Sequence, residues 1–124
     1  MKYKLIKRKN PQKREEEGKW YASPVNSGKV SQKEISNDIV ALSSLSRGDV
    51  SNVIDNLLDT VPKYLLMGKS VNLGGLGTFR LSFSSKGVEK PEEFNTKLIK
   101  GVKVIFTPST ELLEQIKKAK FEKA

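Results

Sequence analysis

The side chains best suited to chemistry in this sequence are its lysines and arginines. The 124 residues contain 23 Lys and Arg against 14 Asp and Glu, with no histidine and no cysteine. Their absence removes the commonest general base, the commonest metal ligand and every disulfide or thiolate site. Asp55 and Asp59 lie one helical turn apart, but a solvated helix face explains that pair better than a metal site. We therefore expect no enzyme, no metal, no cofactor and no small-molecule substrate.

The net charge of +9 favours an anionic partner. Residues 1–30 hold nine basic and three acidic groups, and residues 69–108 hold seven and three, whereas residues 31–68 are slightly acidic. Nucleic acid is the first candidate for such a layout and an anionic membrane surface the second. No stretch approaches the roughly 18 apolar residues of a membrane span, and no amphipathic basic helix with aromatic anchors is visible. We expect a cytoplasmic protein without a membrane partner.

Two short strands are predicted at the start of the chain. Residues 2–9 mix apolar and basic side chains, and residues 19–25 contain Trp20 and Tyr21. The residues between them are polar and typical of a loop, so the two strands can pair as a β-hairpin. A disordered basic tail is the alternative, although its apolar content would be unusual. Residues 1–30 are thus expected to form a basic extension, a hairpin followed by a linker.

Two helices follow. Ser31 and Glu34 have the spacing of a capping box, in which the serine hydroxyl accepts from one free N–H and the acid from another. Ser46 and Asp49 repeat that signal before a longer apolar stripe. Pro62 lies inside the stripe, where it removes one backbone hydrogen bond and should kink the helix.

The apolar faces of these helices are too wide for one neighbour in so small a chain. Chains of this size bury only about two-thirds of their unfolded surface, and oligomerisation is a common remedy. We expect a homodimer whose interface joins both helices to two sheet phenylalanines. The candidate interface residues are Ile35, Ile39, Leu42, Val50, Ile54, Leu57, Leu58, Val61, Leu65, Phe79 and Phe83.

The glycine run at residues 74–77 predicts a turn between a short strand at 69–73 and an alternating strand at 78–84. A nucleotide-binding glycine loop opens onto a helix, whereas this one opens onto a strand, so a phosphate loop is not expected. Gly68 is placed to end the preceding helix.

The last part of the chain predicts one more strand and one more helix. Residues 102–106 alternate apolar and other side chains. Thr107 and Pro108 are candidates for the cap and first residue of a short terminal helix. We expect that helix to extend as far as Phe121.

Residues 69–79, KSVNLGGLGTF, together with the two helices before them, resemble the HU/IHF family of bacterial histone-like DNA-binding proteins. The resemblance covers residues 30–116 in the order helix, helix, β-hairpin, protruding segment, returning strand and short helix. Residues 1–30 lie outside the common core and are similar to the extended HU-related variant of Bacteroides-type bacteria.

The resemblance implies an α+β, HU/IHF-like fold. It consists of a two-helix base, a three-stranded antiparallel sheet with a short arm and a C-terminal helix, in an intertwined homodimer. Residues 31–124 would form this DNA-binding domain, with the N-terminal β-hairpin added to it. The arms would embrace double-stranded DNA in the minor groove, where a proline wedge kinks the duplex. Contacts mainly to phosphates would give little sequence preference to a nucleoid-associated, architectural protein.

The arm departs from the family pattern. Residues 84–101 contain no arginine, and Glu89, Glu92 and Glu93 surround Pro91, the candidate wedge. Carboxylates beside phosphates are repelled, so an ordinary turn proline is the alternative. The strand register near the arm is left open, because a bulge at Gly101 would exchange the two faces.

Two groups of residues are candidate DNA contacts, and a solvated surface is the alternative for both. The first group lies on the sheet and arm and comprises Lys69, Arg80, Lys86, Lys90, Pro91, Lys97, Lys100 and Lys103. The second group is a possible second contact in the N-terminal strand and comprises Lys2, Lys4, Lys7, Arg8 and Lys9. The acidic arm also keeps a different function open, a structural or protein-interaction dimer that has lost arm-mediated DNA binding.

Overall fold

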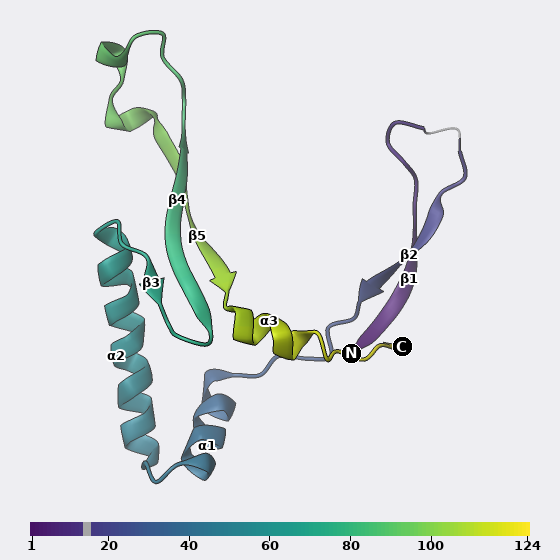
Figure 1. Cartoon of the computed structure of the whole chain (residues 1–124), viewed down its shortest axis with the longest axis vertical. Helices are drawn as coiled ribbons and strands as arrows, with labels where there is room; N and C mark the ends of the chain where they lie inside the picture. Colours follow the sequence, from purple (N-terminus) through teal and green to yellow (C-terminus); the bar gives the residue numbers. More distant parts are fainter. Residues whose placement is uncertain (14–15) are drawn as a thin grey trace.

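The structure is a computed structural model that describes residues 1–13 and 16–124. Figure 1 shows two β-ribbons that rise in the same direction from a base, with a long helix beside one of them and a short helix at the bottom of the molecule. The elements in chain order are β1 (Lys2–Arg8), β2 (Lys19–Pro24), α1 (Gln32–Leu42), α2 (Arg47–Leu66), β3 (Val71–Asn72), β4 (Gly77–Ser85), the 3₁₀ turns η1 (Pro91–Glu93) and η2 (Thr96–Leu98), β5 (Ile99–Pro108), α3 (Thr110–Ile116) and β6 (Glu122–Lys123).

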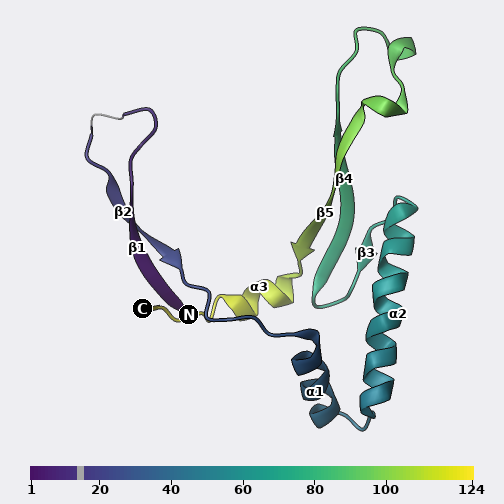
Figure 2. The ribbon, with the colours of Figure 1, turned by 180° about the vertical axis from the view of Figure 1, so that it is seen from behind.

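The strands form two separate three-stranded sheets, with the orders β2-β1-β6 and β3-β4-β5. The predicted N-terminal hairpin is confirmed, because β1 and β2 pair antiparallel along their length. Sequence patterning missed β6, which pairs parallel with β1 through Lys2 and Tyr3. The two termini therefore lie together at the foot of the hairpin, as Figures 1 and 2 both show.

Both predicted helices are present, and their caps differ. The Ser46 hydroxyl accepts from the Asp49 N–H at 3.1 Å, and the Asp49 carboxylate accepts from the Ser46 N–H at 3.2 Å, which completes a capping box. At α1 only half of the expected box forms, since the Glu34 carboxylate accepts from the Ser31 hydroxyl instead of the backbone. Helix α2 continues through Pro62 to Leu66.

Three boundaries differ from expectation. The first sheet strand is shorter than residues 69–73, and the terminal helix begins later than predicted. Thr107 and Pro108 belong to β5, and Ser109 caps α3 because its hydroxyl accepts from the Leu112 N–H at 3.0 Å. Phe121 lies beyond the end of α3, on the segment that leads into β6.

The chain encloses very little core of its own. Among the described residues, the only buried apolar side chains are Val50, 2% exposed, and Leu65, 6% exposed. The accessible surface is 10945 Å², whereas a compact monomer of this mass would expose about 6,700 Å². The fold therefore leaves large apolar faces uncovered in the single chain.

Candidate nucleic-acid interface

A bulge decides which side chains share a face on the β4–β5 ribbon. Ser82 pairs with Lys103 but Ser84 pairs with Lys100, so β5 carries one residue more than β4 over this interval. Side chains of directly paired residues lie on the same face, and alternate residues of a strand share a face. Lys100 and Lys103 are three residues apart and would face opposite ways in a regular strand. The bulge brings both onto the face of Ser82 and Ser84.

Arg80 belongs to the same face, because it lies two residues before Ser82 on β4. Arg80, Lys100 and Lys103 are all exposed, and none makes an ion pair with a residue that the structure describes. We call these three residues the sheet basic face. Exposed cations without protein partners are available to phosphate oxygens, which they bind with release of counterions.

Gly101 allows this bulge, because a glycine adopts the backbone angle that the extra residue requires. Its φ of 67° lies in the left-handed region, where side chains are strained. The Ser84 hydroxyl donates to the Lys100 carbonyl at 3.2 Å across the irregularity. The bulge that the sequence left open is thus present, and it gathers positive charge on one side.

The opposite face of the ribbon is apolar. The rings of Phe79 and Phe106 lie 4.8 Å apart, tilted by 38°, and Leu81 pairs with Val104. Phe83 is on this face as well and is exposed. The ribbon is consequently two-sided, with cations on one side and an incompletely covered apolar side on the other.

The remaining arm candidates lie elsewhere. Lys86, Lys90 and Lys97 belong to the end of the ribbon, where the two 3₁₀ turns interrupt it (Figure 1). Pro91 is the first residue of η1, followed directly by Glu92 and Glu93, and its carbonyl accepts from the Phe94 N–H at 3.2 Å.

Lys69 does not belong to the sheet basic face. The backbone N–H of Lys69 donates to the Tyr64 carbonyl at the end of α2. The Lys69 ammonium lies 5.7 Å from the centroid of the Tyr64 ring. The contact is a cation–π pair, which holds the charge over the helix end.

The N-terminal candidates divide between two faces. By register, Lys4 pairs with Ser23 and Arg8 with Lys19, whereas Lys7 pairs with Trp20. Lys2, Lys4, Arg8 and Lys19 therefore share one face, which we call the hairpin basic face. Lys7 lies on the other face, and Lys9 follows the end of β1. Lys19 was missed because its alignment with Arg8 depends on the hairpin register, which sequence does not fix.

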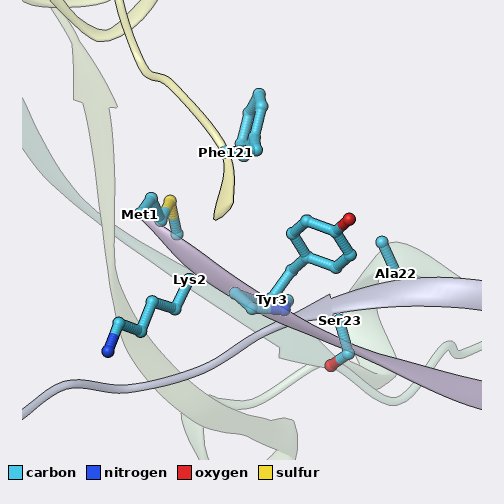
Figure 3. Close-up of a pocket in the computed structure, with 7 residues that line it drawn as sticks. Met1, Lys2, Tyr3, Ala22, Ser23 and Phe121 are labelled. Atoms are coloured by element: carbon cyan, nitrogen blue, oxygen red, sulfur yellow. The ribbon is translucent and has the colours of Figure 1, made fainter. Parts of the chain in front are cut away.

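Figure 3 shows this division at the foot of the hairpin, where Tyr3, Ala22 and Phe121 rise on one side of the strands while Lys2 and Ser23 point to the other. A mainly apolar hollow of about 430 Å³ lies here, and it is lined by Met1, Lys2, Tyr3, Ala22, Ser23, Pro24 and Phe121. No residues within 1–13 and 16–124 form a cluster suited to a metal ion.

The predicted interface residues are mostly open in the single chain. Leu42 is 88% exposed, and Ile35, Ile39, Leu57, Leu58 and Phe83 are exposed as well. Ile54, Val61 and Phe79 are half-buried, and Val50 and Leu65 pack inside the chain. Over the part of the chain that is described, no helix has the length and apolar character to cross a membrane.

Solved structures of similar fold match this chain over most or nearly all of its length. A candidate bacterial DNA-binding protein from Bacteroides vulgatus matches with a TM-score of 0.65 and 21% identity, over 98% of this chain and 47% of its own. This chain therefore spans about half the length of that protein. An HU bound to DNA from Anabaena gives a TM-score of 0.56 at 16% identity, over 73% of this chain and 100% of its own. An HU variant from Thermotoga maritima gives 0.52 at 18% identity, over 70% and 99%.

Comparison with curated proteins gives no match. The model of one protein family, described as an HU domain fused to a winged helix-turn-helix, Ig or glycine-rich motif, matches residues 1–123. Its match includes the N-terminal hairpin and the C-terminal strand as well as the HU-like body. The resemblance seen in the glycine run and its helices is confirmed, and the chain belongs to this HU-HIG family.

Proposed function

We propose that the protein is a non-enzymatic, architectural DNA-binding protein that acts in the cytoplasm on the nucleoid. The observation that carries the proposal is the bulge at Gly101, which collects Arg80, Lys100 and Lys103 on one exposed face. Such a face neutralises phosphates with little regard to base sequence. The HU-like fold, the family and a DNA-bound HU among the similar structures support the same function.

The acting species in this proposal is a homodimer. The excess of exposed surface over a compact monomer is about 4,200 Å², and obligate dimer interfaces bury about 2,000–5,000 Å² in total. We assign that interface to the exposed apolar residues of α1 and α2, such as Leu42 and Leu58.

The second candidate is a structural or protein-interaction dimer that does not depend on DNA. The ribbon end favours it, because Glu89, Glu92 and Glu93 lie there and residues 84–101 contain no arginine. Repulsion between these carboxylates and phosphates opposes insertion of Pro91 into a duplex. In the proposed function, the sheet basic face makes the phosphate contacts, and strong bending of the duplex by Pro91 is not included.

A salt titration of binding to a short duplex of random sequence tests the proposal, with solution mass measured alongside. We expect a dimer whose affinity falls steeply with salt. In a plot of log affinity against log salt concentration, each phosphate contact should add about 0.9 to the steepness of the slope. The variant Arg80→Gln/Lys103→Gln should lower the slope by about 2 per protomer.

The control is Lys33→Gln/Lys117→Gln, which removes the same charge from α1 and the end of α3 and should leave the slope nearly unchanged. A dimer that does not bind duplex at about 50 mM salt, where phosphate contacts are strongest, would overturn the proposal and favour the second candidate. A monomer at micromolar concentration would contradict the dimer.

A further inference from the structure

The hairpin basic face is a second concentrated set of cations, outside the HU-like body. Lys2, Lys4, Arg8 and Lys19 lie on one side of sheet β2-β1-β6. All four are exposed, and none forms an ion pair with any residue in 1–13 or 16–124. Four cations on one small face repel each other, and a bound polyanion relieves that repulsion.

The two sides of this small sheet have different chemistry. The other side carries Tyr3, Leu5, Ala22 and Trp20, and Tyr3 and Ala22 line the hollow of Figure 3 together with Phe121. The separation is partial, because Ile6 lies on the basic side and Lys7 and Lys123 lie on the other. The basic side also presents the hydroxyls of Tyr21 and Ser23, which are donors suited to phosphate oxygens.

Acidic groups border this face at its two ends. Glu122 of β6 is in register with Lys2, and Glu16 and Glu17 line a hollow of about 200 Å³ with Arg8 and Lys19. Lys4, in the middle of the strand, is in register with Ser23 and has no acidic residue opposite it on β2. Along β1 the face extends from Lys2 to Arg8, a length of about 20 Å at 3.3 Å per residue. That length matches about six base pairs of duplex at 3.4 Å each.

We propose that the hairpin basic face is a second DNA-contact surface, which binds the phosphate backbone of the same duplex away from the sheet basic face. This inference rests on the proposed function and adds a second contact to it. Figures 1 and 2 show the hairpin and the β4–β5 ribbon as separate ribbons rising from the base that includes α3. Two separate basic ribbons touch a duplex at two places along its length, so the hairpin extends the bound site.

Matched charge removal on the two faces of the hairpin tests the proposal. Lys4→Gln/Lys19→Gln takes two cations from the basic side, and Lys7→Gln/Lys123→Gln takes two from the opposite side. The full-length variants are titrated with salt against a random duplex long enough for both ribbons. We expect the first pair to lower the slope of log affinity against log salt by about 2 per protomer. The second pair should change that slope by less than about 0.5.

A footprint on a longer duplex gives an independent readout. The wild type and Lys7→Gln/Lys123→Gln should protect the same length, and Lys4→Gln/Lys19→Gln a shorter one. Equal slopes and equal footprints for the two pairs would overturn the second contact. If the wild type binds and Arg80→Gln/Lys103→Gln weakens it, the proposed function stands despite that result. If the wild type fails to bind any duplex, the proposed function fails first. Unchanged circular dichroism and melting for each variant exclude misfolding.

Discussion

The β4–β5 ribbon and the β1–β2 hairpin gather cations on one face by different routes. In the hairpin, Lys2, Lys4 and Arg8 have even spacing, so regular alternation is sufficient. In the β4–β5 ribbon, Lys100 and Lys103 have odd spacing, and a left-handed glycine has to insert one residue to align them. The number of charged residues in a segment therefore says less about its basic surface than the strand register, which decides which cations share a face.

The comparison also separates what holds each ribbon together. The β4–β5 ribbon packs on α2 and contains the contacting, mutually tilted rings of Phe79 and Phe106. The hairpin is held by β6, a strand from the far end of the chain that pairs parallel with β1. The Met1 ammonium also donates to the Lys120 carbonyl at 2.8 Å. One ribbon therefore depends on the helical body and the other on the meeting of the two termini.

The largest expected effect comes from Gly77, at the start of β4. Its φ is 149°, and a Cβ there would collide with the Thr107 carbonyl and lie 2.7 Å from the Phe106 ring. Gly77→Ala should cost about 3 to 5 kcal/mol of unfolding free energy. Chemical denaturation followed by far-UV circular dichroism measures it, because the long helix α2 packs on this ribbon.

Gly18→Ala is the counterpart in the hairpin, where a Cβ would lie 2.6 Å from the Arg8 carbonyl. It should shift the NMR signal of the single indole, that of Trp20, and leave the helical circular dichroism unchanged. Loss of helix in Gly18→Ala would show that the two ribbons are not independent.

An intermediate effect is expected at the bulge itself. Gly101→Ala forces a side chain to φ 67° and places a Cβ 3.3 Å from the Ser84 hydroxyl. The strain is about 1–2 kcal/mol, and a shifted register would turn Lys100 away from Arg80 and Lys103. Melting temperature and the salt slope should both fall. Gly87→Ala in the same arm, where nothing lies within 4 Å of the added Cβ, is the control and should preserve both.

The smallest expected effect is a pH dependence in the helical base. The hydrogen bond from the Ser46 hydroxyl, followed by that from the Ser46 N–H, lowers the pKa of Asp49 below its ordinary value of 3.8. A lowered folded-state pKa stabilises the fold above the unfolded pKa, and the stabilisation disappears as pH falls through the folded pKa.

Melting temperatures measured from about pH 5 down to pH 2 should therefore fall more steeply for the wild type than for Asp49→Asn. The strands β1 and β2 lie away from this cap in both Figure 1 and Figure 2, so the Trp20 signal should not follow the difference. If the melting temperatures of the two proteins fall equally with acid, the Asp49 cap does not contribute to the pH dependence of stability.

Sequence patterning predicted the helices, the strand after the glycine run and the N-terminal hairpin, because each has a period of its own and a start or stop signal. It could not find β6, since two residues have no period and their partner lies at the other end of the chain. Phe121 was wrongly assigned to the terminal helix, because its apolar side chain continued the helical pattern and the strand β6 that follows it was not recognised. Of the candidate site, the types of residue were predictable, whereas Lys19 and the separation of Lys7 from Lys4 needed the hairpin register.

The bulge at Gly101 has a consequence for how related sequences are compared. On β5 the count of residues between Lys100 and Lys103 has a role that no single side chain has. With the same residues in a regular ladder, Lys100 would lie on the side of Phe83. Removal of one residue between the two lysines would instead remove the bulge and keep both on one face. In an alignment, a relative that keeps this odd spacing but has no glycine at this position would therefore signal a changed surface, although every cation is retained. A relative that is one residue shorter here needs no bulge to place its two lysines on one face.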